Sequence, residues 1–441
     1  MKPLKKGIRL PDFKYRSLSS PQIYLPEPAR FITLLLNQHS GPAIKPCVEK
    51  GNSVFVGTKV AEGSHWNSVP LHSSTSGRVS EVTPTSIVIE SDEADRLDPS
   101  IHIRSEIPTD PGQLIQIIRE AGLVDLGGSA NPTHVRLIQA RSEGIHTLIL
   151  NGCESEPFLT CDHMLMLRHP VEVLKGAELL RIASGAKRAV IAIERNKLEA
   201  LEILNSKNYN LKITTVETAT LPVRYPQGME RCLVETFAGR HLKPGESSLN
   251  VGILVENVAT AFAAYEAISL RKPLYERVIT VDGPCVVEPK NLWARIGTRP
   301  MDLLRSCKGL MREPERIIFG GPMTGEAIEH LEVPITKKVQ GILALPSELA
   351  NSGAEEACIR CGRCVEACPE LLIPETLARA VRKNDIALLE EYDLNSCTEC
   401  GSCTYVCPSK IPLAAVIRSG KNTLVKEEVH SKPAYVFSSE G

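Results

Sequence analysis

The feature that most constrains this 441-residue chain is a cysteine phrase that occurs twice near the carboxyl end. The first copy, "CIRCGRCVEACP", begins at Cys358, and the second, "CTECGSCTYVCP", begins at Cys397. Both copies have the spacing C-x2-C-x2-C-x3-C-P, which is typical of ligands to [4Fe-4S] clusters. We therefore expect two such clusters in this part of the chain.

The expected ligand sets are crossed between the two copies. Three thiolates at this spacing can hold three irons of a cubane from one tight loop. The fourth cysteine precedes a proline, which starts a helix and directs that sulfur toward the other cluster. One set is then Cys358, Cys361, Cys364 and Cys407, and the other is Cys397, Cys400, Cys403 and Cys368.

Zinc is the alternative metal, and disulfides are the alternative use of the cysteines. A tetrahedral zinc site needs two C-x2-C pairs and would leave a third cysteine and a Cys-Pro step in each copy unexplained. The chain has 14 cysteines, but a disulfide framework would conflict with a reducing compartment. Apolar residues at helical spacing join the two copies, so we expect a small helical domain that its metal stabilises. Because clusters carry electrons and generate none, an electron source is expected upstream.

Composition excludes several classes of protein. Lys and Arg number 51 against 52 Asp and Glu, for a net charge of -1, so no basic field attracts nucleic acid. Only 4% of residues are aromatic, which also argues against base stacking. No window has the roughly 18 uncharged apolar residues of a membrane span, and the amino terminus lacks the apolar core of a secretory signal. We expect a soluble or peripheral cytoplasmic protein of about two to four domains.

Residues 110–330 alternate short apolar runs with amphipathic segments, which predicts an α/β fold with a largely parallel sheet. The loop "GLVDLGGSANPTHVRL" (122–137) offers the backbone N–H groups of Gly127 and Gly128 to an anion. The loop "NGCESEPFLTCD" (151–162) follows a strand, at the edge where open α/β sheets bind ligands. The plain alternatives are a turn that serves only chain geometry and, for Glu154 and Glu156, a solvated rim.

Other stretches also have both a structural and a functional interpretation. Asn257 follows a buried run in "VGILVENVATAFAAYEA", where it either caps a helix or binds a ligand. Gly320-Gly321-Pro322 favours a tight turn. Residues 45–82 look like the barrel-sandwich hybrid of lipoyl and biotinyl carriers, but the expected exposed tip, "LHSSTSG", has no lysine to carry a cofactor. We therefore expect a scaffold or docking role for this segment.

With these parts in order, the chain resembles the RnfC family, the C subunits of Rnf electron-transport complexes, essentially end to end. The resemblance also covers "KGIRLPDFK" near the amino terminus, "YPQGME" (225–230), "NLWARIGT" (291–298) and "GGPMTG" (320–325). It implies an α/β multidomain fold of four parts. These are a barrel-sandwich hybrid domain (1–105), a Rossmann-like flavin/NADH domain (106–245), a β-grasp, SLBB-like domain with a return to the flavin domain (246–345), and a helical bis-[4Fe-4S] ferredoxin-type domain with a tail (346–441).

The family shares its middle with the flavin-bearing, NADH-oxidising subunit of respiratory complex I. The resemblance therefore implies an NADH:ferredoxin oxidoreductase subunit in which electrons from NADH pass through FMN and two [4Fe-4S] clusters. The implied partners are the other Rnf subunits, especially the ferredoxin-like B subunit and the membrane subunits, with ferredoxin downstream. The implied location is peripheral, at the cytoplasmic face of the bacterial inner membrane, with ion translocation carried out by other subunits.

The resemblance also assigns site residues. The family's flavin-loop pattern GLxGxGGAGFPTxxK falls on residues 122–136, and the phrases N-x-x-E-x-E-P and N-V-x-T fall on residues 151–157 and 257–260. The implied cofactor-binding residues are Gly127, Gly128, Thr133, Arg136 (in place of lysine), Asn151, Asn257 and Thr260. The implied catalytic residues are Glu154 and Glu156.

The chain departs from the flavin-loop pattern at Asp125, Ser129, Ala130 and Asn131 in the loop, and at Arg136 after it. Ala130 adds a Cβ where the backbone should approach a ligand, and Asp125 adds a negative charge close to the expected phosphate. A second hypothesis is therefore an electron-relay or assembly subunit with a degenerate flavin site. A third is a soluble relative such as the cobalamin reductase of bacterial microcompartments, which has the flavin and cluster modules in another order.

Overall fold

The computed structural model describes residues 7–350 and 353–431, with the backbone alone for residues 424–431. The expected domains 1–105 and 346–441 therefore extend beyond the described residues, at 1–6, 351–352 and 432–441. The chain divides into two compact units. One comprises Leu10–Val223 and Ser247–Ala350, and the other joins Arg224–Glu246 to the carboxyl-terminal part of the chain.

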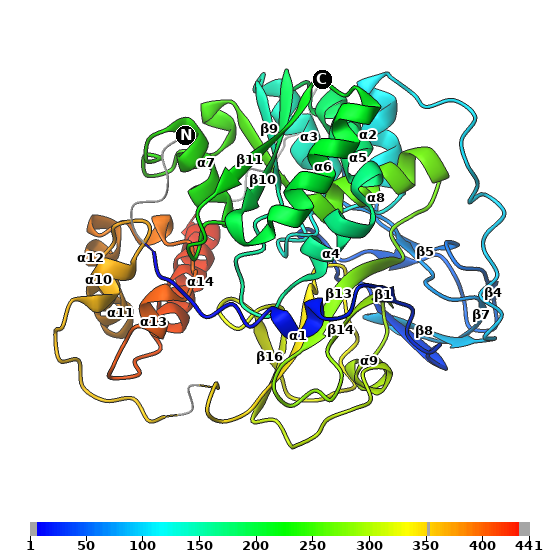
Figure 1. Cartoon of the computed structure of the whole chain (residues 1–441). Helices are drawn as coiled ribbons and strands as arrows, with labels where there is room; N and C mark the ends of the chain where they lie inside the picture. Colours follow the sequence, from blue (N-terminus) through cyan, green and yellow to red (C-terminus); the bar gives the residue numbers. More distant parts are fainter. Residues whose placement is uncertain (1–6, 351–352, 432–441) are drawn as a thin grey trace, which may run out of the picture. The chain divides into compact units, whose positions relative to one another are not determined.

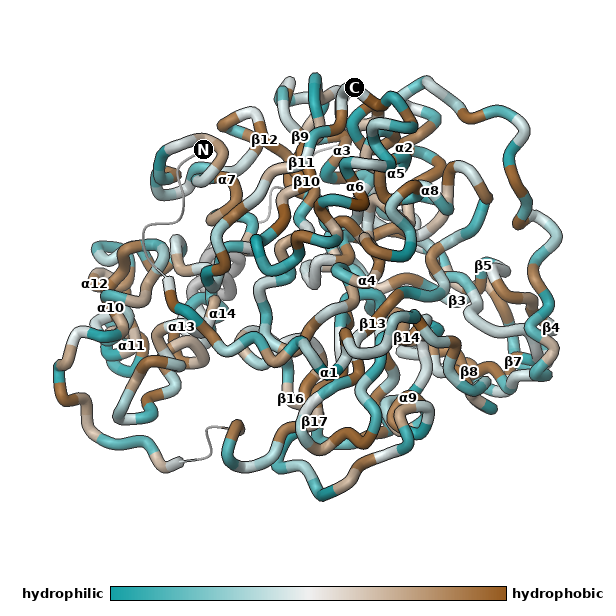
Figure 2. The backbone as a smooth tube through the Cα atoms, viewed as in Figure 1, coloured by the Kyte–Doolittle hydropathy of each residue, from teal (hydrophilic) through white to brown (hydrophobic). Residues whose placement is uncertain are grey.

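The first unit contains a four-stranded parallel sheet with helices beside it (Figure 1). Its order is β11-β10-β9-β12, formed by β9 (Thr147–Asn151), β10 (Arg188–Glu194), β11 (Val216–Leu221) and β12 (Ile253–Asn257). Strands β9, β10 and β12 are almost entirely buried, whereas β11 alternates buried and more exposed residues, and hydrophobic residues colour much of the sheet in Figure 2. Near-continuous apolar runs of this kind are expected where helices cover both faces of a parallel sheet. The predicted parallel α/β sheet is confirmed.

Helices accompany the parallel sheet, and α2 and α8 begin at side-chain caps. The helices are α2 (Pro111–Glu120), α3 (Thr133–Ser142), α4 (Cys161–Arg168), α5 (Pro170–Ser184), α6 (Leu198–Leu211) and α8 (Val258–Leu270). The Asp110 side chain accepts from Gln113 N at the start of α2, and Pro111 occupies its first turn. Gly176 brings α5 against α8, because a Cβ there would lie 1.8 Å from the Ala261 carbonyl oxygen.

The amino-terminal strands form two small sheets over an apolar core. The first has the order β2-β8-β7-β4, from β2 (Phe31–Leu35), β4 (Ser53–Val54), β7 (Gly77–Val82) and β8 (Ser86–Ser91). The second contains β3 (Lys45–Pro46), β5 (Lys59–Glu62) and β6 (Leu71–His72). The predicted exposed tip, residues 71–77, is instead buried, and Ser74 Oγ donates to the Ile296 carbonyl 2.6 Å away. The segment packs inside the unit because its side chains are short, and that packing fits a scaffold better than a swinging arm.

A six-stranded mixed sheet completes the first unit, with the order β1-β14-β13-β17-β15-β16. Its strands are β1 (Ile23–Tyr24), β13 (Glu276–Asp282), β14 (Lys290–Arg295), β15 (Arg316–Phe319), β16 (Glu326–Ile328) and β17 (Gly341–Leu345), with helix α9 (Pro300–Ser306) between β14 and β15. The first and last main strands, β13 and β17, are parallel neighbours, while β13 and β14 form an antiparallel hairpin. This arrangement is the one expected of a β-grasp domain.

The second unit is helical. It contains α7 (Glu230–Ala238), α10 (Arg363–Ala367), α11 (Pro374–Lys383), α12 (Ile386–Glu391), α13 (Ser402–Tyr405) and α14 (Leu413–Ser431). Its small core includes Leu377, Leu389, Leu394, Leu413 and Ile417. Among the helices of the described residues, none is both long and apolar enough to cross a bilayer.

Candidate functional site

The eight cysteines of the repeated phrase line two cavities in the second unit. The outer cavity is lined by Cys358, Cys361, Cys364 and Cys407, and the inner cavity by Cys368, Cys397, Cys400 and Cys403. Each cavity thus takes three cysteines from one copy of the phrase and the last cysteine from the other copy. The two differ in exposure: Cys358 and Cys361 are exposed, whereas Cys368, Cys400 and Cys403 are each at most 8% exposed.

The two cysteine loops have the same backbone. Arg360 and Glu399 have φ values of 56° and 58°, and the glycines two residues later, Gly362 and Gly401, have values of 75° and 77°. In each loop the residue two positions after the first cysteine donates its N–H to that sulfur, Arg360 to Cys358 and Glu399 to Cys397, both at 3.4 Å. N–H···S bonds of this kind favour the thiolate form that iron requires.

The chemistry of the donor set fits a metal cluster. Burial raises the pKa of Cys368 to about 11 and raises that of Cys403 further, with the neighbouring thiols adding to the effect. Four closely placed thiols in a buried pocket therefore ionise only when a cation compensates their charge. The residues present fit [4Fe-4S] clusters in both cavities.

Residues 224–246 belong to the inner cavity's surroundings, although they lie between β11 and β12 in the sequence. The Tyr225 hydroxyl donates to the Cys400 carbonyl oxygen at 2.6 Å, and Tyr225 is 4% exposed. The Arg231 guanidinium is bonded to Glu370, two residues after Cys368, and to the Leu242 carbonyl at 2.8 Å. Sequence reasoning quoted "YPQGME" as a family feature and missed this role, since the pairing spans 175 residues.

The glycine loop before α3 is bonded to its own side chains. Gly127 N donates to Asp125 Oδ1 at 3.2 Å, and Ser129 Oγ donates to Asp125 Oδ2 at 2.6 Å. Leu126 N donates to Thr260 Oγ1 at 2.9 Å, which ties the loop to the start of α8. Gly127, Gly128 and Ser129 retain solvent exposure, so the loop remains accessible to a ligand.

Arg136 and Thr133, both on α3, are placed differently. Arg136 Nε pairs with Glu256 Oε1 at 2.9 Å, and its guanidinium also donates to the Val255 carbonyl oxygen. Glu256 is 1% exposed, so the Arg136 charge is held by a buried carboxylate of β12.

Thr133 is fully buried, and its hydroxyl has no hydrogen-bond partner among the described residues. His134 Nε2 lies 2.8 Å from the Trp66 carbonyl, so its ring belongs to the core.

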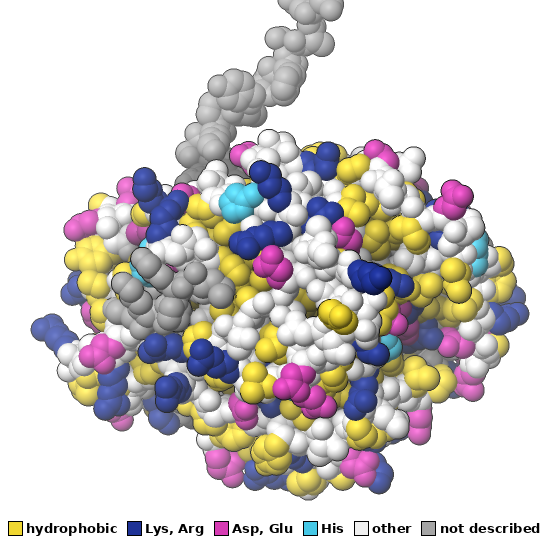
Figure 3. All heavy atoms as spheres, turned by 45° about the horizontal axis from the view of Figure 1, so that its top comes forward, with side chains coloured by type: hydrophobic (Ala, Val, Ile, Leu, Met, Phe, Trp, Pro, Cys, Tyr) yellow, Lys and Arg dark blue, Asp and Glu magenta, His cyan; other side chains and the backbone are white. Residues whose placement is uncertain are grey.

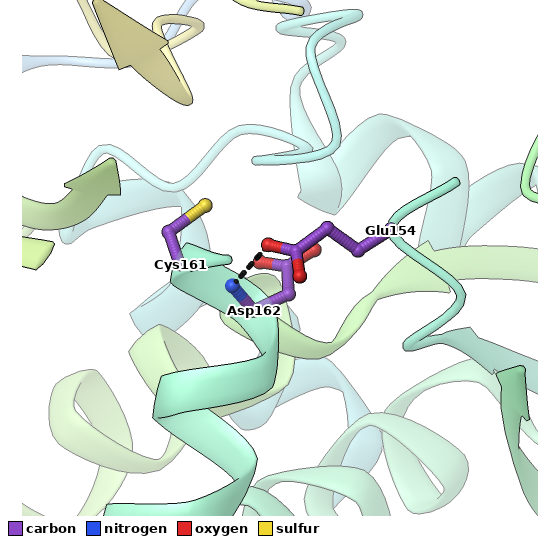
Figure 4. A group of neighbouring side chains, drawn as sticks. All are labelled: Glu154, Cys161 and Asp162. Atoms are coloured by element: carbon purple, nitrogen blue, oxygen red, sulfur yellow. Dashed lines mark hydrogen bonds between the residues drawn. The ribbon is translucent and has the colours of Figure 1, made fainter. Parts of the chain in front are cut away.

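Glu154, Cys161 and Asp162 form a buried group at the start of α4 (Figure 4). Their ligand atoms lie within 4.8 Å of one another. Glu154 Oε1 accepts from Asp162 N at 2.7 Å, so Glu154 caps the helix from outside it. Asn257 Nδ2 donates to Asp162 Oδ2 at 2.7 Å. Burial, with the nearby Glu154 charge, raises the pKa of Asp162 to about 7.

Asn257 caps a helix, which is one of the two roles that its sequence position allowed. Its Oδ1 accepts from Ala259 N at 2.7 Å and so caps α8, while its amide group points to Asp162 and to the Asn151 carbonyl. Asn151 Oδ1 accepts from Cys153 N at 3.1 Å. The structure therefore brings together the ends of β9 and β12, the first turn of α4 and the glycine loop, at the carboxyl edge of the parallel sheet.

Glu156 connects the loop after β9 to the turn after β15. Its carboxylate accepts from Met323 N at 3.0 Å and from Thr324 Oγ1 at 2.6 Å. A Cβ at Gly321 would lie 2.3 Å from Glu156 Oε2, so only glycine fits there. The turn at 320–325 is thus a partner of a predicted catalytic residue, and sequence reasoning had treated it as a plain turn.

Lys14 was also missed by sequence reasoning. Its ammonium group donates to the carbonyl oxygens of Glu154 (3.0 Å), Glu156 (2.8 Å) and Leu159. Lys14 is 5% exposed, and burial lowers its pKa to about 8. Beside it, Phe13 stacks on Phe158 with ring centroids 4.8 Å apart. The residues just before α1 (Tyr15–Leu18) therefore fix the loop that carries both predicted catalytic carboxylates.

Three known domain families match consecutive parts of the chain. Residues 2–105 match the RnfC barrel-sandwich hybrid domain, residues 118–266 the Nuo51 FMN-binding domain, and residues 355–411 the 4Fe-4S dicluster domain. An NAD+-reducing [NiFe]-hydrogenase is similar in structure, with a TM-score of 0.50 and 18% identity over 72% of this chain and 62% of that chain. At that identity the likeness concerns the fold alone.

Relatives that match most of this chain are also found. The C subunit of the proton-translocating ferredoxin:NAD(+) oxidoreductase complex of Clostridium ljungdahlii is 35% identical over 89% of this chain and 88% of its own length. The C subunit of the Na(+)-translocating complex of Acetobacterium woodii is 34% identical over 86% and 87%. The C subunit of the ion-translocating oxidoreductase complex of Haemophilus influenzae (strain PittEE) is 37% identical over 95% and 65%. This chain therefore belongs to the RnfC family, the C subunits of ion-translocating oxidoreductase complexes.

Proposed function

We propose that this chain is the electron-input subunit of an Rnf-type complex, in which electrons from NADH pass through FMN and two [4Fe-4S] clusters toward ferredoxin. The observation that carries the proposal is the pair of cavities, each lined by four cysteines drawn from both copies of the phrase. A chain that joins such a pair to an FMN-binding domain has both the two-electron and the one-electron part of the reaction.

The cluster ligands in this proposal are Cys358, Cys361, Cys364 and Cys407 for the outer site and Cys368, Cys397, Cys400 and Cys403 for the inner site. When bound, FMN accepts a hydride and returns its electrons singly, which is the form that a cubane accepts. The flavin-holding residues would be the backbone of Gly127 and Gly128 with Thr133 for the phosphate, and Asn151, Asn257 and Thr260 beside the ring. The Arg136 guanidinium is paired with Glu256, so in this proposal it fixes α3 against β12.

Glu154 and Glu156 act in this proposal through position. Both carboxylates accept hydrogen bonds from the backbone of neighbouring elements, so they hold the loop after β9 in one shape. Asp162, whose raised pKa lets it keep a proton near neutral pH, is the group best able to hold or release a proton there.

The partners we propose are the membrane subunits, the ferredoxin-like B subunit and ferredoxin, with attachment at the cytoplasmic face of the inner membrane. In this proposal the other subunits carry out ion translocation. None of the helices in the described residues is both long and apolar enough to span a membrane. On the drawn face, side chains of both charges are interspersed with apolar ones (Figure 3). That distribution suits protein partners better than nucleic acid.

Anaerobic purification of the full chain tests this function. We expect about eight irons and eight sulfides per chain, FMN that binds on addition, and bleaching of both chromophores by NADH. Zinc in place of iron, or cluster absorbance that NADH leaves unchanged in FMN-loaded protein, would contradict the proposal.

The second candidate function is an electron relay without a flavin. One observation favours it: the Gly127 N–H that an FMN phosphate would use is bonded to Asp125. Under this candidate the clusters accept electrons from a reduced protein, and NADH has no effect at any FMN concentration.

A further inference from the structure

Asp125 places an anion on the glycine loop. Its carboxylate is 8% exposed and accepts from Gly127 N and from the Ser129 hydroxyl. A Cβ built at Gly127 would lie 3.3 Å from both Asp125 oxygens, so the space against this glycine is already filled by the carboxylate. The loop thus binds a negative group, and that group is its own side chain.

Three residues of the loop form one bonded set around Asp125. Besides Ser129, Asn131 takes part: Asp125 N donates to the Asn131 carbonyl at 2.8 Å, and Asn131 N lies 3.3 Å from Ser129 Oγ. These are three of the four positions at which the loop departs from the family pattern. The fourth, Ala130, has a φ of 52° that glycine would adopt without strain. The departures therefore work together to close the loop on itself.

The rest of the loop still suits a phosphate. Gly128 is exposed, the nearest atom to a Cβ built there is 3.7 Å away, and no partner for its N–H is found among the described residues. The buried Thr133 hydroxyl, on the first residue of α3, is also unpaired there. A phosphate placed on these donors would meet the Asp125 carboxylate, and two like charges on one N–H repel strongly.

We propose that the Asp125 carboxylate competes with the phosphate of FMN for the glycine loop. Asp125 must release Gly127 N before the loop can hold the cofactor. The inference rests on the proposed function only in taking FMN as the ligand. Asp125 then sets how tightly this protein holds its flavin, so that FMN exchanges more readily than the loop's backbone alone would allow.

The test compares FMN with riboflavin, which lacks the phosphate. Each flavin is titrated anaerobically into the full cluster-loaded chain, and binding is followed by quenching of flavin fluorescence. The variants are Asp125→Gly, which removes the competitor, and Asp125→Asn, which keeps the shape and the Gly127 bond without the charge. Glu143→Gln, at the exposed end of α3, is the control for the loss of one negative charge.

We expect Asp125→Gly to bind FMN at least about tenfold more tightly than the unaltered chain, equivalent to roughly 1.4 kcal/mol. Asp125→Asn should fall between the two, Glu143→Gln should match the unaltered chain, and riboflavin affinity should stay within about twofold throughout. Loss of hydrogen-exchange protection in β9, β10 and β12 in Asp125→Gly would report misfolding, in which case Asp125→Asn alone decides.

Two outcomes would overturn the inference. One is an equal change for FMN and riboflavin, because Asp125 would then act on the flavin ring or on the fold. The other is unchanged FMN affinity, or no FMN binding, in both Asp125 variants. Neither outcome depends on NADH. If Asp125 is found to compete with the phosphate but NADH does not reduce the clusters, the proposed function fails and this inference stands.

Discussion

The cysteine cavities and the glycine-loop site both lie in regions that match cofactor-binding families, yet they use their ligand-binding atoms differently. In the second unit, eight sulfurs line two cavities, and burial in the inner cavity is unfavourable for thiolates without a cation. At the carboxyl edge of the parallel sheet, Gly127 N, Arg136, Asn257 and Glu156 are all bonded to other protein groups. The first region is incomplete without its ligand, whereas the second is largely completed by the protein.

The largest expected effect follows from that difference. Removal of iron with an anaerobic chelator should unfold the cysteine loops and α10 and α13, because a small core and the metal together stabilise this unit. Hydrogen exchange should then lose most protection over residues 355–411 and keep it in β9, β10 and β12. Removal of flavin should change protection only around residues 122–137. Equal loss of protection in both units after chelation would break the comparison.

The next largest effect concerns Lys14, whose ammonium group holds the loop after β9. Lys14→Met should destabilise the first unit by about 3 kcal/mol, because three carbonyl oxygens in buried or partly buried contacts would lose their donor. Thermal unfolding of the chain measures this, with the exposed Lys45→Met as control. A change below about 0.5 kcal/mol would show that the loop does not depend on the ammonium group.

Asp162 should make the first unit sensitive to pH. Its pKa is about 7 in the fold and 3.8 when unfolded, so from about pH 4 to pH 7 the unfolded chain ionises while the folded chain keeps the proton. Stability is therefore lost as the pH rises through this window. Asp162→Asn removes the loss, so its advantage over the unaltered chain should grow as the pH rises from about 4 to about 7 and level off above that. The free energy of unfolding is measured with denaturant at several pH values for both proteins. If Asp162 did not titrate in this range, the difference between Asp162→Asn and the unaltered chain would be the same at every pH.

The smallest expected effect is at the inner cavity. Tyr225→Phe leaves the buried Cys400 carbonyl without its donor, at a cost of about 1 kcal/mol. It should shift the reduction potential of the inner cluster by tens of millivolts and leave the outer one within error. An EPR redox titration measures both clusters in one sample, and Tyr405→Phe, which removes an exposed hydroxyl, is the control. Equal shifts of both clusters would show that residues 224–246 do not act on the inner site alone.

The cysteine sites could be predicted from sequence because cluster geometry is local: each loop fixes three ligands within about seven residues. The parallel sheet followed from the apolar runs of β9, β10 and β12, and the caps at Asp110 and Asn257 from short-range hydrogen bonds. Because strands and helices alternate in the sequence, the loops after β9 and before α3 could be placed at the same edge of the parallel sheet.

The remainder depended on contacts between distant residues. Lys14 meets the loop after β9 across 140 residues, and Tyr225 meets Cys400 across 175. The buried tip at residues 71–77 is polar in sequence, and its burial follows from hydrogen bonds such as that to Ile296, which no local pattern contains. The individual departures in the glycine loop were visible in the sequence, but their bonding to one another was not.

The crossed assignment of the cluster ligands has one direct test. Cys407→Ala removes a cysteine of the second copy that lines the outer cavity. Anaerobically reconstituted protein should retain about four irons per chain, with an EPR spectrum that matches Cys361→Ala and differs from Cys400→Ala. A spectrum that matches Cys400→Ala instead, or loss of both clusters from every single variant, would contradict the account.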